Sequence, residues 1–133
     1  MCGHAMRSIN KTNTRKKLIL ANDKLFREII QIRDKVCQKT GRTTNPQVCH
    51  FYTRSNLRVR WIEDNACLLN GGTHLFWAHK NPTQFREFWI KRLGQKKFDE
   101  LEILARYIAP VKELDLLLRN YDLKRRLKSL REV

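Results

Sequence analysis

Hydrophobic residues recur along most of this chain with the spacing of an α-helix. Within residues 15–35, Leu25, Phe26, Ile29 and Ile30 fall on one helical face. The same spacing continues in the second half of the chain, where it predicts three further helices over residues 83–93, 96–108 and 110–131. Helices are therefore expected to make up most of the structure.

Two short segments between the helical stretches have the composition of β-strands. Residues 48–52 are rich in strand-forming residues, and residues 57–62 alternate between apolar and polar positions. Turn-forming residues at 53–56 separate them. Residues 65–72 are expected to form a turn that leads into a short helix over 73–79. The order of one helix, two strands and then further helices predicts an α+β fold that is mostly helical.

Length and charge narrow the class of protein. The chain has 133 residues, which is the length of one domain. Lys and Arg number 28 against 13 Asp and Glu, so the formal net charge is +15. Such an excess needs an anionic partner, and nucleic acid is the commonest one. We expect a basic, flexible arm over residues 1–17 and a single domain over residues 18–133.

Nothing in the sequence predicts contact with a membrane. The longest apolar runs are far shorter than the roughly 20 residues that a membrane span needs. No apolar export signal follows the N-terminal Met, so we expect a cytoplasmic protein. In that compartment the four cysteines are expected to be reduced thiols or metal ligands rather than disulfides; they are Cys2, Cys37, Cys49 and Cys67.

Three polar residues have a spacing that suggests chemistry. His50 lies in the first expected strand, Asn65 follows the second, and His74 lies on the short helix. A strand pair and a helix that carry His, Asn and His in this order are the layout of an HNH, or ββα-metal, nuclease. Each histidine could equally be an ordinary polar residue, because this spacing also arises by chance.

Phosphodiester hydrolysis explains why these residue types would occur together. It needs a neutral imidazole that takes a proton from water, and a hydrogen-bonding group that fixes the tautomer of that imidazole. It also needs a divalent cation that stabilises charge on the phosphate and on the leaving oxygen. His50 would be the base, Asn65 the group that orients it, and His74 a metal ligand.

The sequence around these residues has a wider pattern. It begins with a helix that ends in Arg33-Asp34 before Cys37, and it closes with helical residues 85–102. Between them stand Val48-Cys49-His50-Phe51 and a run that contains Leu57, Arg58, Arg60, Trp61, Glu63 and Asn65. This pattern resembles that of the phage NinG (Rap) recombination protein family, a group within the HNH superfamily.

The resemblance covers residues 25–103 and carries expectations about fold and function. It implies an HNH-like core over residues 36–80, followed by C-terminal helices over 83–131. It also implies an endonuclease that cleaves Holliday junctions or other branched DNA, in recombination or repair, in a phage-infected or prophage-bearing cell. The products would carry 5′-phosphate and 3′-hydroxyl ends.

The chain departs from the family at the zinc-binding positions. Family members carry two Cys-x-x-Cys knuckles that hold a structural zinc ion. Here only Cys37 remains, and Thr40, Asn70 and Thr73 occupy the other three positions. Threonine and asparagine are not zinc ligands at ordinary affinity, so we expect no knuckle zinc.

A second departure concerns the catalytic cation. The family places an aspartate shortly before the base histidine, but residues 45–49 contain no carboxylate. We expect a divalent cation, Mg²⁺ or Mn²⁺ first, with Zn²⁺ or Ni²⁺ as alternatives. Mg²⁺ prefers oxygen ligands, so a site made by His74 with a carbonyl or Gln47 would be weak. Mn²⁺, Ni²⁺ or Zn²⁺ would suit His74, alone or with His79, better.

Basic residues near the candidate base are expected to bind phosphates. Arg58 and Arg60 would share one face of the second strand and flank His50 together with Arg54, since Arg suits bidentate phosphate contacts. Further basic side chains could extend this track, namely Lys80, Arg86, Lys91 and Arg92. Recognition is expected to depend on backbone and shape rather than on base sequence.

Three hypotheses remain open at this point. The first is the metal-dependent HNH endonuclease, a phosphodiester hydrolase that acts on branched or structured DNA. The second is a catalytically weak or inactive DNA-binding protein derived from such a nuclease. The third is an RNA-binding protein, which charge alone does not exclude. A homodimer would suit two-fold junction cleavage, and it could form through Leu114, Leu117, Leu118 and Tyr121, which could equally lie in the core.

Overall fold

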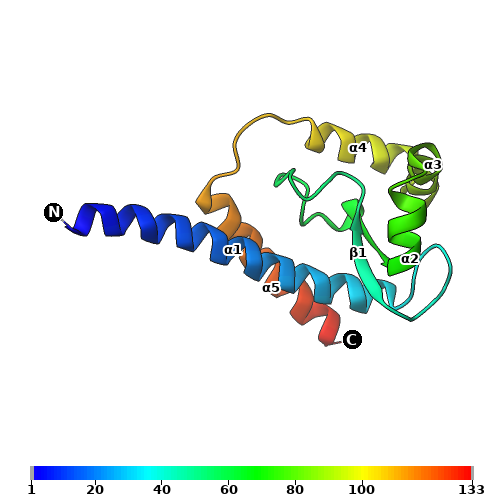
Figure 1. Cartoon of the computed structure of the whole chain (residues 1–133), viewed down its shortest axis with the longest axis horizontal. Helices are drawn as coiled ribbons and strands as arrows, with labels where there is room; N and C mark the ends of the chain where they lie inside the picture. Colours follow the sequence, from blue (N-terminus) through cyan, green and yellow to red (C-terminus); the bar gives the residue numbers. More distant parts are fainter. Residues whose placement is uncertain (1, 133) are drawn as a thin grey trace. The chain divides into compact units, whose positions relative to one another are not determined.

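The computed structural model describes residues 2–132, with side chains from residue 14 onward (Figure 1). Its elements follow in the order α1 (Cys2–Asp34), β1 (Pro46–His50), η1 (Glu63–Asn65), β2 (Ala66–Asn70), α2 (Gly71–Thr73), η2 (His74–Ala78), α3 (Pro82–Leu93), α4 (Gln95–Ala105) and α5 (Glu113–Arg131). The η1 turn is a 3₁₀ helix, and η2 is a π-helix. The expected α+β class, mostly helical, is confirmed at this level.

The described chain divides into two compact units. One contains α1 up to Ile29 together with α5, and the other runs from Ile30 to Ala109. We had expected one domain over residues 18–133. Residues 2–17, expected as a basic arm, are helical and form the first part of α1.

In the first unit, α1 and α5 lie side by side and run in the same direction (Figure 1). Three contacts pair α1 in order with α5 and the segment just before it: Arg15 with Val111, Asn22 with Leu116, and Glu28 with Arg131. Asn22 is fully buried, and its amide also accepts a hydrogen bond of 2.9 Å from Asn120. Both helices bury apolar side chains, among them Phe26, Ile29, Leu123 and Leu127. Helical periodicity therefore predicts that both helices form. It does not predict the buried face of α5, because the residues that could have lain in the core are exposed, namely Leu114, Leu117, Leu118 and Tyr121, and Leu116, Leu123 and Leu127 are buried instead.

The second unit contains one antiparallel strand pair, β1 with β2. The first expected strand is confirmed, shifted to Pro46–His50. The second expected strand, over 57–62, is wrong: this segment forms successive turns, in which the amide of Val59 bonds to Asn56 and that of Ile62 bonds to Val59. The true partner is β2, which lies within the expected turn at 65–72 and is buried at every position.

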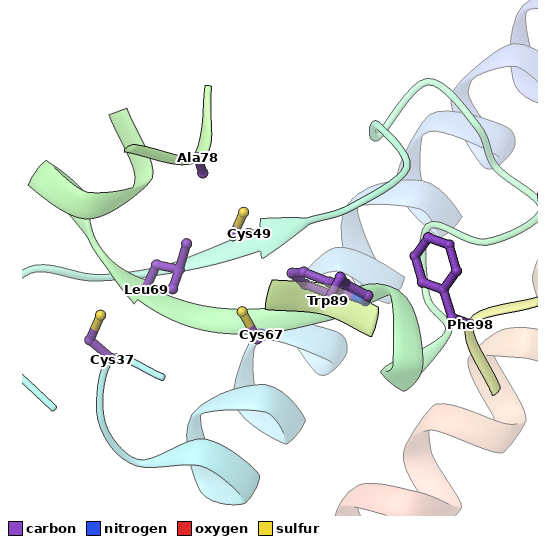
Figure 2. Close-up of a cluster of buried hydrophobic side chains, with 7 residues drawn as sticks. All are labelled: Cys37, Cys49, Cys67, Leu69, Ala78, Trp89 and Phe98. Atoms are coloured by element: carbon purple, nitrogen blue, oxygen red, sulfur yellow. The ribbon is translucent and has the colours of Figure 1, made fainter. Parts of the chain in front are cut away.

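A cluster of buried side chains holds the sheet to the following helices, and Figure 2 shows its members. Both strands, η2, α3, α4 and the segment after α1 contribute to it: Cys37, Cys49, Cys67, Leu69, Ala78, Trp89 and Phe98. Trp89 is fully buried and donates its indole N–H to the main-chain oxygen of Asp64, at 2.8 Å. The strand pair and the η2 segment are thereby fixed in one body.

The buried cysteines of the cluster are free thiols. Burial raises the pKa of Cys49 to about 12 and also raises the pKa of Cys67. A thiol that stays protonated is a poor nucleophile, so these two residues act as small hydrophobic side chains.

None of the helices within residues 2–132 combines the length and the apolar character that crossing a membrane requires.

Candidate active site

His50 is the last residue of β1, where it pairs with Ala66 of β2. Its Nε2 lies 2.9 Å from the main-chain oxygen of Arg60. A carbonyl oxygen only accepts, so this contact assigns the proton of the neutral imidazole to Nε2 and the lone pair to Nδ1. Nδ1 is therefore the atom of this half-buried ring that can take a proton from water.

Asn65 is fully buried and organises the loop between the strands. Its Oδ1 accepts from the amide of Tyr52 at 2.8 Å, and its Nδ2 donates to the main-chain oxygens of Tyr52 and Val59, each at 3.0 Å. Its own main-chain oxygen accepts from the amide of Phe51. The side chain that we expected to orient His50 instead binds the main chain of the loop, and the orienting group is the Arg60 carbonyl.

His74 opens the η2 segment, as the sequence predicted for the short helix. Its Nδ1 lies 3.0 Å from Oε1 of Gln47, and its ring stacks on that of His79 with a centroid distance of 4.8 Å. Gly71 leaves room for this contact, because a Cβ there would lie 3.2 Å from Nε2 of Gln47 and would clash with the side chain of Asn45. Burial lowers the pKa of His74, and the neighbouring His79 lowers it further.

The contacts of β1 do not bring His50 and His74 together. Residues 47 and 50 are an odd number of positions apart, so Gln47 and His50 leave opposite faces of the strand, roughly 10 Å apart along it. His74 binds on the Gln47 side, and Cys49 also faces that side and packs in the buried cluster. Between residues 14 and 132, no group of three or more His, Cys, Asp and Glu side chains could hold a metal ion.

The type of donor atom available near His74 determines which divalent cation could bind there. Oε1 of Gln47 is engaged by the Nδ1–H of His74, which leaves Nε2 of His74 and the imidazole of His79 as donors. Mg²⁺ needs oxygen ligands, so these residues do not fit it. Imidazole nitrogens fit Zn²⁺, Ni²⁺ and similar ions, with water completing the coordination.

The expected phosphate-binding residues fall into three groups. Arg58 donates to the main-chain oxygen of Ala109 at 2.8 Å and lies 5.1 Å from the ring centroid of Tyr107, and Arg92 pairs with Asp34 and Gln38. These two side chains hold the fold together. Arg60 is half-buried and donates to the main-chain oxygen of Arg54. The remaining expected side chains are exposed: Arg54, Lys80, Arg86 and Lys91.

The expected pairing of Arg58 with Arg60 on one strand face is wrong, because residues 57–62 form turns rather than a strand. The sequence could not reveal the internal partners of Arg58 and Arg92, because Ala109 and Asp34 lie more than fifty positions away along the chain. The Arg60 carbonyl was also missed, since any residue type carries such an oxygen.

At the four positions where the family carries zinc-binding cysteines, the side chains of Cys37 and Asn70 accept hydrogen bonds from nearby backbone amides. Sγ of Cys37 accepts the amide of Thr40 at 3.4 Å, and Oδ1 of Asn70 accepts the amides of Gly72 and Thr73 at 3.0 and 3.4 Å. Burial raises the pKa of Cys37, but hydrogen bonds from Thr40, Asn70 and Lys39 outweigh it and lower that pKa to about 7. Each turn is closed by its own acceptor atom, Sγ of Cys37 in one and Oδ1 of Asn70 in the other.

Chelation is therefore expected to leave the fold intact. Excess EDTA should shift the melting temperature by less than about 2 °C, which corresponds to well under 1 kcal/mol. The measurement is thermal unfolding followed by circular dichroism, with zinc-saturated EDTA as the control. A fall of roughly 10 °C or more with free EDTA alone would show that a structural metal contributes to folding.

Comparison with family models, with curated proteins and with solved structures gives no match. The resemblance to the NinG family therefore remains an expectation, carried by the residues on which it was drawn.

Proposed function

We propose that this protein is a metal-dependent HNH-type endonuclease that hydrolyses phosphodiesters in branched or otherwise structured DNA. The observation that carries the proposal is the hydrogen bond between Nε2 of His50 and the Arg60 carbonyl, which makes Nδ1 the basic atom. The order of the elements supports it: His50 ends β1, Asn65 precedes β2, and His74 lies on the short helix that follows. His50, Asn65 and His74 thus follow one another along the chain as in the HNH layout, although Asn65 comes before the second strand rather than after it.

In the proposed reaction, Nδ1 of His50 takes a proton from a water molecule as the oxygen of that water bonds to phosphorus. The bond from phosphorus to the 3′ oxygen breaks, and that oxygen takes a proton from solvent. The ends are then a 5′-phosphate and a 3′-hydroxyl. A divalent cation at the phosphate would stabilise the charge on its oxygens. Asn65 keeps the 51–59 loop in shape, so that the carbonyl of Arg60 stays beneath the imidazole.

The charge of the chain supports a nucleic-acid partner. The net charge of +15 favours association with the phosphates of a nucleic acid, whatever its base sequence. Arg54 is exposed on the same loop that orients His50, and Lys80 is exposed just after η2. We propose recognition through backbone and shape, in the cytoplasm of a phage-infected or prophage-bearing cell, during recombination or repair.

The test is cleavage of a labelled four-way junction by the full chain in Mg²⁺, Mn²⁺, Ni²⁺ or Zn²⁺. We expect metal-dependent cutting that is faster on the junction than on linear duplex or single-stranded DNA, with ends that a DNA ligase can rejoin. Binding is measured in parallel at one stated salt concentration, because counterion release dominates affinity. Cutting of the junction no faster than of the linear duplex would contradict the preference for branched DNA.

A second function, a DNA-binding protein without catalysis, is favoured by the residue before His50. That residue is Cys49, which is 1% exposed, and no carboxylate precedes it within residues 45–49. His74 contacts Gln47, which lies on the opposite face of β1 from His50, and this points the same way. Tight junction binding with no cutting in any of the four cations would establish this function. Stronger competition by structured RNA than by the junction would instead favour an RNA partner.

A further inference from the structure

The η2 turn is held by the core on one side and exposes large apolar side chains on the other. Trp77 packs against the buried cluster, and its ring meets those of Phe85 and Phe88 edge-on, with centroid distances of 5.8 and 5.2 Å. The two preceding side chains of the same turn, Leu75 and Phe76, are 56% and 63% exposed. The turn thus presents two adjacent apolar side chains to solvent from a fixed backbone.

The loop between α1 and β1 lies against this turn, within the same compact unit. Nζ of Lys39 lies 4.9 Å from the ring centroid of Trp77. The amide of Gly71, at the start of α2, donates to the main-chain oxygen of Asn45 at 2.9 Å. The loop, α2 and η2 therefore form one continuous surface.

This surface carries cations and no carboxylate. Lys39 and Arg42 are exposed on the loop, and Lys80 is exposed just after η2. The loop, α2 and η2 contain no Asp or Glu. Nζ of Lys80 lies 5.2 Å from the ring centroid of Phe76. An exposed aromatic ring among cations is complementary to a nucleotide, because the base has a flat apolar face and the phosphate is anionic.

We propose that this surface binds unpaired nucleotides of a DNA strand, with a base stacked on the ring of Phe76 and phosphates bound by the cations around it. Both Phe76 and Lys80 are exposed, so the ammonium group can turn from the ring to a phosphate when a base stacks. We name this the η2 surface; it consists of Leu75, Phe76, Lys39, Arg42 and Lys80.

The choice of DNA rests on the function proposed above, and the η2 surface deepens that function. A branch point offers bases that lack a stacking neighbour, whereas the bases of a linear duplex are stacked on both sides. Every base has a flat face, so stacking on Phe76 would favour branched DNA without any preference for base sequence.

A membrane surface is the other partner that apolar side chains beside lysines can bind. A helix that binds a membrane presents an apolar face along several turns, but η2 has five residues and exposes two apolar side chains. The observations therefore favour a base. Cosedimentation with vesicles of phosphatidylglycerol and phosphatidylcholine that is lost in Phe76→Ala and kept in Phe76→Leu would overturn the proposal.

The experiment measures binding of the full chain to a fluorescein-labelled strand of about twelve thymidines, a length within the usual site sizes for single strands. Fluorescence anisotropy is read at one salt concentration without divalent cations, and a second strand of the same length lacks its bases. Phe76→Ala should weaken binding of the thymidine strand by about 5- to 100-fold, the usual effect of removing one stacking side chain, and should leave binding of the abasic strand unchanged. Equal loss on both strands would overturn the proposal.

Further variants separate stacking from apolar contact and from charge. Phe76→Tyr should bind as the natural chain does, whereas Phe76→Leu should lose as much affinity as Phe76→Ala, because leucine has no flat ring. Lys80→Gln should weaken binding of both strands alike and reduce the slope of log affinity against log salt by about 0.7. Full affinity in Phe76→Leu would overturn stacking. Circular dichroism of each variant shows that the fold is kept.

The matched control is Tyr121→Ala, on α5 in the other compact unit. Tyr121 is also 63% exposed, and the guanidinium of Arg125 lies 5.8 Å from its ring centroid. This variant should bind the thymidine strand normally. Loss equal to that of Phe76→Ala would show that exposed rings contribute wherever they lie, and it would overturn the assignment to the η2 surface.

Strand binding can be separated from cleavage, since it needs neither a divalent cation nor His50. His50→Ala should therefore bind the thymidine strand as the natural chain does. Normal junction cutting with no effect of Phe76→Ala on strand affinity would overturn the η2 surface and leave the nuclease in place. Binding through Phe76 with no cutting in any cation would contradict the nuclease and support the η2 surface. Tighter binding of a twelve-uridine RNA strand through Phe76 would overturn the choice of DNA.

Discussion

Replacing His50 with alanine is expected to lower the rate of junction cleavage by roughly 10²–10⁴-fold, the usual contribution of a general base. The reason is the tautomer that the Arg60 carbonyl imposes: Nε2 holds the hydrogen, so Nδ1 is the acceptor that the substitution removes. Affinity for the junction should stay nearly the same, because a neutral imidazole contributes little to binding of phosphates. The measurement is single-turnover cleavage with saturating protein, which separates the chemical step from binding.

The matched control is Ser55→Ala. Ser55 is exposed on the same loop, and its hydroxyl lies 2.7 Å from that of Thr53 rather than against the imidazole. It should cut at the natural rate. Added imidazole should restore part of the cleavage by His50→Ala, which a purely structural role would not allow. An unchanged rate in His50→Ala would remove this residue from the reaction and would leave the contact with Arg60 as a structural feature.

The helices of this protein can be predicted from its sequence because the residues that begin and end a helix lie within a few positions of its ends. Helix α3 matches the prediction for 83–93 closely, since Pro82 suits the first turn and Gly94 ends the helix with a φ of 85°. Helix α5 begins at Glu113 instead of 110, where the carboxylate of Asp115 accepts the amide of Lys112 at 2.8 Å. These signals act within a few residues, so they can be recognised without knowledge of the fold.

The second strand was predicted at the wrong place because two different structures, a half-buried strand and a series of tight turns, can both alternate buried and exposed residues. Val59 and Trp61 are buried and their neighbours are not, which is the pattern of a half-buried strand. Here the pattern comes from tight turns that wrap around the amide of Asn65. The true strand β2 is buried at all five positions and therefore shows no alternation. Burial on both faces depends on distant segments, and so the local pattern does not reveal it.

The candidate site shows the same division between local and distant information. His50 ends β1 and His74 lies on the short helix, as the local pattern predicts, whereas Asn65 precedes the second strand instead of following it. Their partners do not follow from it: the imidazole of His50 meets a main-chain oxygen, and His74 meets Gln47, twenty-seven positions away. The π-turn that stacks His79 on His74 is a choice between two helical hydrogen-bond patterns, and no residue type marks it.

Asp34 ties the end of α1 to the rest of the second unit. Its carboxylate is 3% exposed and accepts from Arg33 at 2.8 and 3.1 Å, from Arg92 at 3.1 Å and from the amide of Leu68 at 2.8 Å. Arg33 also donates to the main-chain oxygen of Ala66. One buried anion thus joins α1, β2 and α3, and it compensates two cations whose side chains are each 22% exposed.

Asp34→Asn is therefore expected to destabilise the protein by about 3 kcal/mol, the lower end of the range for removal of one partner from a buried ion pair. The neutral amide has the same size, but it leaves the charges of Arg33 and Arg92 without their carboxylate and places an N–H₂ group toward one of their donors. The measurement is urea unfolding followed by tryptophan fluorescence. Trp61 and Trp89 are buried in the same unit and report on its unfolding.

The natural chain and Asp34→Asn are expected to differ in their free energy of unfolding, and the pH dependence of this difference identifies the ionised carboxylate as its source. Burial raises the pKa of Asp34, but hydrogen bonds from Arg33 and the Leu68 amide, with the charges of Arg33 and Arg92, outweigh it and lower that pKa below its ordinary value of 3.8. A lowered folded-state pKa means that the stabilisation is complete above this ordinary value and is lost as the pH falls through the folded-state pKa. The natural chain should therefore lose its advantage over Asp34→Asn on acidification. The control is Glu102→Gln, which removes an ion pair with the exposed side chain of Arg106 and should cost no more than about 0.5 kcal/mol at any pH. A difference that persisted unchanged below the folded-state pKa would show that packing, rather than the ionised carboxylate, holds α1 to the strand and helix.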